Sequence, residues 1–400
     1  MIGSGSGRPP FPVTLDNWQS AGQLNWTFQH MAEIFPTALI SRGTAAPGLP
    51  RIAYEPDALP VRTHDGETAS LHAVMAGTDT DGWLVILDHP TWGPQVLVER
   101  YAGEMTPSTQ HLMMSVTKSV VGITIGALVG QGVIDTEAAA THYVPALYDS
   151  GYAGATVRHL LDMRSGIRFS EDYLDPTAEV RVLEQAFGWA PKLTPDVPGT
   201  LRDFLVSLVQ DGPHGGPFDY RSCESDVLGW VVEAATGRPF VEVVSELVWS
   251  RIGAEFDANI GVDSAGSGMF DGGMSATLGD LARFGLMILR HGTSLTGEQV
   301  VPSWWIEDSF AGGPDSVQAF ADSPGDNRMP GGFYRNQFWI PDARRPVLLC
   351  LGIHGQMIYV NAGAGVVAAK LSSWPTPQNA WKLFSTVAAF DAISADVAGA

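Results

Sequence analysis

Two groups of short apolar runs, one in the first third of the chain and one near its C-terminus, have the composition of β-strands. Residues 83–87 and 95–101 are rich in valine, leucine and isoleucine, and a segment containing Pro90, Gly93 and Pro94 separates them. Apolar runs divided by turn residues in this way predict a β-hairpin. Four further runs predict an antiparallel meander, over residues 333–340, 347–353, 357–360 and 365–371.

The chain between these strand groups has the periodicity of helices. Apolar residues recur there every three to four positions, which is the spacing of one buried helical face. The helices that this pattern predicts cover residues 115–131, 201–209, 226–235, 240–252 and 278–291. The segment before residue 80 shows little periodicity, and only a short helix over 26–34 is expected in it.

Strands at both ends and helices in the middle predict the domain organisation. Strands that are distant in sequence often share one sheet in an α+β domain. We therefore expect an α+β fold in which residues 1–130 and 280–400 form a discontinuous α/β domain. Residues 131–279 are expected to form a mostly helical domain, with the functional site at the seam.

Composition limits the class of protein and its partners. With 45% hydrophobic and 16% charged residues, the 400-residue chain has enough apolar material for a large core and too little charge for disorder. Acidic residues outnumber basic ones by 43 to 23, which gives a net charge of −20. This charge argues against nucleic-acid partners and anionic membranes, because both are bound through clustered lysine and arginine.

The N-terminus and the hydropathy of the chain suggest a cellular location. Residues 1–10 lack the basic start and apolar run of a secretory signal, and no stretch has the length and apolarity of a transmembrane helix. A cytoplasmic protein is therefore expected. Cys223 and Cys350 are expected to be buried free thiols, because their spacing matches neither a metal site nor a redox pair.

The clearest chemical signal is the pair Ser115 and Lys118 at the head of an almost uncharged apolar helix. Residues three apart lie on one face of a helix, roughly 5–6 Å apart at Cβ. Burial disfavours the charged form of a lysine, and a neutral amine can take the proton of a hydroxyl. The pattern predicts a serine nucleophile with a lysine base, whereas an incidental surface pair is the alternative.

Two later segments supply further candidates. Tyr220 and Ser222 precede a predicted helix that starts at Asp226, on a connecting loop of the kind that holds catalytic groups. A buried structural tyrosine is the alternative for Tyr220. Gly352 and Gly355 interrupt the predicted strands near the C-terminus, where glycine lets another group approach the backbone closely. An amide there could join the N–H of Ser115 in an oxyanion hole.

Other chemistries find no support in the sequence. Residues 363–368 fit a GxGxxA pattern, but a β-rich run follows instead of a helix, so a nucleotide-binding unit is not expected. The chain contains neither a GxSxG nor an HExxH motif. Its ten histidines show no tight ligand spacing, so neither a metal nor another cofactor is expected.

The ordered set Ser115-x-x-Lys118, Tyr220-Arg221-Ser222 and the strand near Gly352 resembles the penicillin-recognising serine enzymes, especially class C β-lactamases and their esterase relatives. Within them, the chain is similar to the 6-aminohexanoate-dimer (nylon-oligomer) hydrolases almost end to end. The segments that carry this similarity include residues 15–18, 25–26, 171–176, 352–356 and 370–375. The resemblance implies a β-lactamase-like fold, with an antiparallel sheet flanked by helices and an all-helical domain beside it.

The resemblance also implies roles for individual residues. Tyr173 would hydrogen-bond the scissile amide from a mobile loop, and Trp189 would line the substrate pocket. The N–H of Ile353 would complete the oxyanion hole with that of Ser115. Glu184 falls where an acidic side chain would meet the amino end of the substrate.

Departures from the β-lactamase pattern change the expected substrate. Ser222 stands where β-lactamases have asparagine, and it is expected to contact the substrate, as is His354. The strand offers Cys350-Leu351-Gly352 or His354-Gly355-Gln356 in place of Lys-Thr-Gly, so it lacks the lysine that usually meets a β-lactam carboxylate. β-Lactams and cell-wall peptides therefore become less favoured substrates.

The sequence thus predicts a serine hydrolase that forms an acyl-enzyme, with Ser115 as nucleophile, Lys118 as base and Tyr220 as proton shuttle. Its substrates are expected to be small molecules, either linear amides such as 6-aminohexanoate dimer or short-chain carboxylic esters. The alternatives are a general carboxylesterase, a class C-type β-lactamase and a non-catalytic binding relative. The chain is expected to be a monomer or a homodimer.

Overall fold

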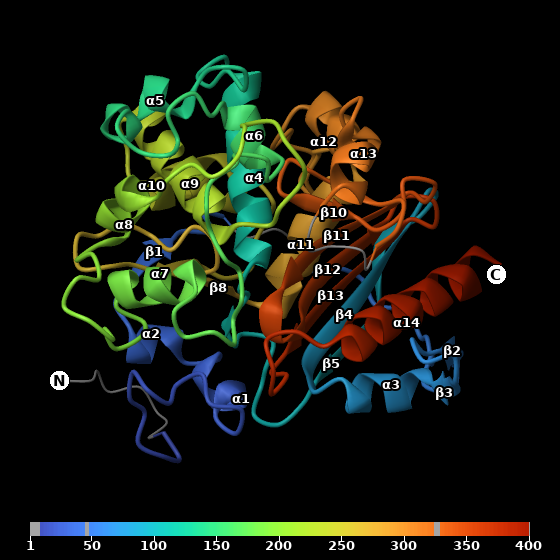
Figure 1. Cartoon of the computed structure of the whole chain (residues 1–400). Coiled ribbons are helices and arrows are strands. Elements are labelled where there is room, and N and C mark those ends of the chain that lie inside the picture. Colours follow the sequence, from blue (N-terminus) through green and yellow to red (C-terminus); the bar gives the residue numbers. More distant parts are fainter. Residues whose placement is uncertain (1–8, 45–47, 324–328, 400) are drawn as a thin grey trace.

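A seven-stranded antiparallel sheet forms the centre of the structure, a computed structural model that describes residues 9–44, 48–323 and 329–399 (Figure 1). Its strand order is β5-β4-β13-β12-β11-β10-β9. The predicted hairpin and meander are both confirmed, and β13 joins them by pairing with β4. The strands are β4 Thr80–His89, β5 Gly93–Tyr101, β9 Phe333–Arg335, β10 Phe338–Ile340, β11 Val347–Gly352, β12 Gln356–Asn361 and β13 Val366–Ser372.

Helices cover both faces of this sheet, which explains why its central strands are apolar on both sides. Helix α11, Leu278–Leu289, packs against β4, β12 and β13 on one face. Helix α14, Ala380–Ala398, lies across the other face beside α3, Leu71–Gly77 (Figure 1). Helices α12, Ser303–Ala311, and α13, Ser316–Ala321, lie near β9.

The middle of the chain forms a group of helices beside the sheet, with α4 between the two (Figure 1). Helix α4 covers Val116–Gly130, close to the predicted range, and almost all of it is buried. The predicted helices after it are present with shifted ends. This group comprises α5 Ala140–Tyr143, η1 Pro145–Leu147, α6 Val157–Leu161, α7 Glu179–Phe187, α8 Leu201–Ser207, α9 Ser222–Thr236, α10 Phe240–Val244 and η2 Ser245–Trp249.

A second, four-stranded sheet was not predicted. Its order is β1-β7-β8-β6, and two of its strands lie within the segment expected to be mostly helical. These strands are too short to leave a pattern of their own in the sequence. They are β1 Thr37–Ile40, β6 His111–Leu112, β7 Ala258–Gly261 and β8 Met274–Ala276, while a separate hairpin is formed by β2 Pro60–Arg62 and β3 Thr68–Ser70.

Several local predictions differ from the structure or are settled by it. The helix expected over 26–34 is two single turns, α1 Leu24–Thr27 and α2 Met31–Ile34, and α9 begins at Ser222 rather than at Asp226. Both cysteines are buried free thiols, as predicted. None of the helices in the described ranges is long and apolar enough to span a membrane. Residues 1–8, part of the segment inspected for a secretory signal, lie outside those ranges.

The close packing of α4 depends on glycine. A Cβ added at Gly126 would lie 2.6 Å from the ring of Trp305, which is fully buried on α12. Gly126→Ala is therefore expected to lower the free energy of unfolding by about 1–3 kcal/mol through overpacking. Gly279→Ala is the matched control, because a Cβ there would meet only Arg283 Nη1 at 3.5 Å. Thermal unfolding of both variants provides the measurement, and equal melting temperatures would contradict the packing argument.

Candidate active site

Ser115 lies at the point where strand β6 gives way to α4. It occupies the N-cap position of that helix and is largely buried, and Met114 before it has a left-handed backbone with φ of +46°. β-Strand pairing fixes the approach, because His111 and Leu112 pair with β8. The hydroxyl therefore lies beside the free N–H groups of a helix start, where negative charge is favoured.

Lys118 follows one turn later and directs its amine back to Ser115. Its side chain is 1% exposed, and Nζ donates to Ser115 Oγ at 2.9 Å. It also donates to Ser222 Oγ at 3.1 Å and to the backbone oxygen of Asp271 at 2.7 Å. Three acceptors match the three N–H donors of an ammonium group. The pair predicted from the sequence is thus in hydrogen-bonding contact.

The charge state of Lys118 differs from the expectation. Burial lowers the pKa of Lys118, but its electrostatic interactions with Tyr220, Asp271, Glu171 and Asp226 raise that pKa by more, so it lies above its ordinary value. The sequence argument took account of the apolar helix alone. It could not include acidic groups that other segments bring to the amine, and the expected depressed pKa is wrong.

Tyr220 lies on the loop before α9, as predicted. Its ring stacks on Trp339 with a centroid separation of 5.2 Å, and Lys118 Nζ lies 5.2 Å from the ring centroid. Burial raises the pKa of Tyr220, while the charge of Lys118 and hydrogen bonds to Ser115 and Lys118 lower it less strongly. The phenol is therefore protonated at neutral pH and lies close to both partners of the reactive pair.

Ser222 and Tyr173 meet at a carboxylate that the sequence argument left without a role. Ser222 Oγ donates to Glu171 Oε1 at 2.6 Å, and Ser222 N donates to Glu171 Oε2 at 3.0 Å. The Tyr173 hydroxyl also donates to Glu171 Oε1. Burial raises the pKa of Glu171, against the lowering effect of Lys118. Glu171 thus fixes the serine that contacts Lys118, although the sequence analysis assigned it no role of its own.

Gly352, which was predicted to let another group approach the backbone closely, lies against the segment that precedes Ser115. A Cβ added at Gly352 would lie 2.7 Å from the backbone oxygen of Met113 and 3.1 Å from Met114 Cβ. Strand β11 therefore ends directly against the turn that holds Ser115. Ile353, the next residue, lines one pocket together with Ser115. The two proposed oxyanion donors consequently border the same space.

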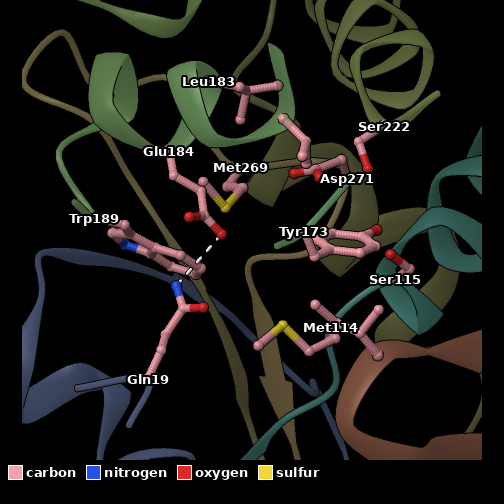
Figure 2. A pocket seen from close by; sticks show the side chains of 13 residues that line it. Gln19, Met114, Ser115, Tyr173, Leu183, Glu184, Trp189, Ser222, Met269 and Asp271 are labelled. Atoms are coloured by element: carbon pink, nitrogen blue, oxygen red, sulfur yellow. Dashed lines mark hydrogen bonds between the residues drawn. The ribbon is translucent and has the colours of Figure 1, made fainter. Parts of the chain in front are cut away.

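That pocket runs from Ser115 toward Glu184 and Trp189 (Figure 2). Its free volume is about 30 Å³, which is room for one or two water molecules. The lining residues come from distant parts of the chain and are Gln19, Met114, Ser115, Tyr173, Val180, Leu183, Glu184, Trp189, Ser222, Met269, Asp271, Gly272 and Ile353.

Of the remaining residues predicted to contact the substrate, Glu184 and Trp189 line the pocket and His354 does not. Glu184 lines the pocket, but its carboxylate accepts from Arg181 Nη1 at 2.7 Å and from Gln19 Nε2 at 3.3 Å. Trp189 lines the pocket and packs edge-on against Trp18. His354 is not among the described residues that line it. The His354 ring is buried beside Phe28 and bonded to the backbone oxygen of Trp374, and burial lowers its pKa to about 4.

A second buried lysine lies outside this pocket. Lys370 on β13 is fully buried and donates to the backbone oxygen of Thr78 at 3.2 Å and to Ser372 Oγ. Burial lowers the pKa of Lys370 to about 7, although Asp81 and Asp79 oppose the shift. The lowered pKa that the sequence argument expected for Lys118 is thus found for Lys370, where fewer anionic groups face the amine.

Lys370 should make stability depend on pH. Its pKa is about 7 in the folded chain and about 10.4 when unfolded, so between these values the unfolded state binds one proton more. The wild type should gain about 1.4 kcal/mol per pH unit relative to Lys370→Met as pH rises from 7 toward 10. Denaturant titrations of both proteins at pH 7.5, 8.5 and 9.5 provide the measurement. A stability difference independent of pH would contradict the shift.

Comparison with known proteins identifies the family of this chain. The model of the Beta-lactamase family matches residues 91–383. The 6-aminohexanoate-dimer hydrolase of Paenarthrobacter ureafaciens is 39% identical over 376 residues, which are 94% of this chain and 91% of that protein. Esterase EstB of Burkholderia gladioli is 31% identical over 172 residues, 40% of this chain and 41% of that protein.

A solved structure extends the similarity to three dimensions. A Bacillus anthracis protein provisionally named a 6-aminohexanoate-dimer hydrolase superposes with a TM-score of 0.87 at 28% identity, covering 97% of both chains. The β-lactamase-like fold expected from the sequence is thereby confirmed. The chain belongs to the β-lactamase family and is a serine hydrolase of that family.

Proposed function

We propose that the protein hydrolyses linear amides such as 6-aminohexanoate dimer, and short-chain carboxylic esters, through an acyl-enzyme on Ser115. The observation that carries this proposal is the 2.9 Å contact between Lys118 Nζ and Ser115 Oγ, at a helix start that borders a pocket. A nucleophile and a base within hydrogen-bonding reach are the minimum that such chemistry requires. The relative named as a 6-aminohexanoate-dimer hydrolase supports the amide substrate, and the esterase supports the ester.

The first half of the reaction forms the acyl-enzyme. Lys118, in its neutral form, takes the proton of Ser115, and Oγ forms a bond to the carbonyl carbon of the substrate. The carbonyl oxygen becomes an oxyanion that the N–H groups of Ser115 and Ile353 stabilise. Tyr220, whose ring centroid lies 5.2 Å from Lys118 Nζ, passes the proton from Lys118 to the leaving nitrogen or oxygen as its bond to carbon breaks.

The second half returns the enzyme to its starting state. A water molecule loses a proton to the same base and attacks the acyl carbon, and the bond to Ser115 Oγ breaks as that oxygen regains a proton. Tyr173 lines the same end of the pocket as Ser115 (Figure 2), where its hydroxyl can exchange Glu171 for the scissile amide. A general carboxylesterase is the second candidate, supported by the similarity to esterase EstB.

Substrate choice tests the proposal. The described lining of the pocket contains acidic Glu184 and Asp271 but no lysine or arginine. A β-lactam carboxylate would therefore be desolvated without a cationic partner, and such an unpaired charge costs about 2–5 kcal/mol. We expect kcat/KM for nitrocefin to be at least about thirtyfold below that for p-nitrophenyl butyrate or 6-aminohexanoate dimer. Efficient nitrocefin hydrolysis would overturn the substrate assignment, and a dimer rate far below the ester rate would favour the general carboxylesterase.

A further inference from the structure

Asn336 and Gln337 form the two-residue turn between β9 and β10, and both are buried. Their exposed fractions are 0% and 1%, and both have a left-handed backbone, with φ of +52° and +69°. Hairpin turns of this kind favour Asn-Gly, because glycine adopts a positive φ without strain. Glutamine at the second position is therefore strained, and strained residues that their surroundings hold in place cluster at functional sites.

The polar groups of Gln337 join this hairpin to three helices. Its Nε2 donates to the backbone oxygens of Leu160 and Leu161 at 3.0 and 3.1 Å, and its backbone N donates to that of Leu161 at 3.0 Å. Its Oε1 accepts from Ser225 Oγ at 2.6 Å, and its backbone oxygen accepts from Ser119 Oγ at 2.9 Å. The side chain thus bridges the end of α6 to the first turn of α9, whereas α4 is joined through the backbone.

The bond to Ser225 fixes the start of α9. Ser225 lies three residues after Ser222, so both serines lie on one face of that helix. Ser222 Oγ accepts from Lys118 Nζ at 3.1 Å. Gln337 therefore holds the helical turn whose first hydroxyl contacts the proposed base.

The segment that follows α6 holds the loop of Tyr220. Met163 lies two residues after the end of α6, and its backbone oxygen accepts from Asp219 N at 3.0 Å. Its sulfur accepts from Arg221 N at 3.5 Å. Both neighbours of Tyr220 are thus bonded to Met163, and Gln337 closes the helix end from which Met163 extends.

The same hairpin contacts the Tyr220 ring directly. Trp339 stacks on that ring with a centroid separation of 5.2 Å, and Tyr334 lies edge-on to it at 6.0 Å. Trp339 and Tyr334 are paired across β9 and β10, next to the turn. The hairpin therefore contacts the ring through its strands and holds both ends of segment 219–225 through Gln337.

We infer that Gln337 is a positioning residue, which holds segment 219–225 so that Tyr220 and Ser222 face Lys118. This inference rests on the proposed function, in which Tyr220 passes a proton to the leaving group. A misplacement of about 1 Å at a reacting group can cost about a hundredfold in rate. Loss of the Gln337 side chain should therefore impair this proton transfer, while Ser115 stays fixed between β6 and α4.

The kinetic test compares ethyl butyrate with p-nitrophenyl butyrate. Both give the same butyryl-enzyme, but ethoxide needs a proton in order to leave, whereas p-nitrophenolate leaves without one. The quantity to measure is the ratio of kcat/KM for the ethyl ester to that for the p-nitrophenyl ester. Gln337→Gly deletes the side chain and suits the left-handed turn. We expect it to lower this ratio at least about tenfold, and an equal loss on both esters would overturn the inference.

A second variant and a control protect this test against a simple loss of stability. Ser225→Ala leaves the turn intact and removes only the bond from Gln337 to α9, so it should lower the ratio at least about threefold. Gly126→Ala, which overpacks α4 against Trp305, is the control and should keep the wild-type ratio. All assays are run well below the melting temperature of each variant. An unchanged ratio in Ser225→Ala, or an equal fall in Gly126→Ala, would overturn the inference.

Tyr220→Phe separates this inference from the proposed function, in which the phenol carries the proton. It should lower the same ratio at least as far as Gln337→Gly does. A ratio lowered by the Gln337 and Ser225 variants but not by Tyr220→Phe would defeat Tyr220 as the proton shuttle alone, because Gln337 would then act through Ser222. A ratio lowered by Tyr220→Phe but not by the other two would defeat the Gln337 assignment alone.

Discussion

Ser115→Ala should lower kcat/KM for esters and amides by at least about a thousandfold, because removal of a nucleophile forfeits the whole covalent route. The variant should fold normally, since the hydroxyl makes no side-chain capping bond to α4. Ester hydrolysis under pseudo-first-order conditions, with the uncatalysed rate subtracted, provides the measurement.

Ser119→Ala is the matched control for this change. Ser119 is a buried serine on the same helix, and its hydroxyl donates to the backbone oxygen of Gln337 at 2.9 Å, away from the pocket. The control should lose some stability and keep its turnover. More than a few per cent of wild-type rate in Ser115→Ala, or an equal loss in both variants, would refute Ser115 as the nucleophile.

Lys118→Arg should lower kcat/KM by a similar factor, because the substitution removes a proton acceptor although it keeps the positive charge. Arginine keeps a positive charge beside Asp271 but stays protonated at any working pH, so it cannot accept the proton of Ser115. The role of Lys118 as base also predicts how the rate depends on pH. Only the neutral form of Lys118 acts as base, and its pKa lies above the ordinary value because nearby negative charges outweigh burial.

The rate should therefore rise with pH across the neutral range. Below the pKa of the base, kcat/KM increases by up to about tenfold per pH unit, and a raised pKa moves the plateau to the alkaline side. Stopped assays from pH 6 to 9, with Ser115→Ala as the background, measure the profile. A plateau already reached near pH 7, or substantial activity in Lys118→Arg, would point to another base.

The sequence was sufficient to predict elements whose local pattern is strong. The run at 115–131 became α4, and the hairpin and meander became a single sheet, because each has a clear period and clear turn residues. The short strands β1, β6, β7 and β8 could not be predicted in this way. Two to four residues carry too little periodicity, and only partners distant in the chain give them a sheet.

The candidate site was predictable in part for the same reason. Ser115 and Lys118 lie three residues apart, so their contact is local and the sequence contains it. The surroundings of Lys118 are not local, because Glu171, Asp226 and Asp271 come from separate segments. The burial of Lys118 could be inferred from the apolar helix, but the direction of its pKa shift depends on those distant groups.

The pairing of β13 with β4 also sets the order in which the protein can be completed during synthesis. Nearly three hundred residues separate the paired positions, such as Val367 and Ile86. The pairing of β13 with β4 therefore cannot form until almost all of these residues have left the ribosome. Until then β4 offers an unpaired apolar edge, which is a template for pairing with other chains. Loop closure over such a distance is slow. Yield of the active enzyme should accordingly depend on chaperones and temperature more than on the stability of the finished fold.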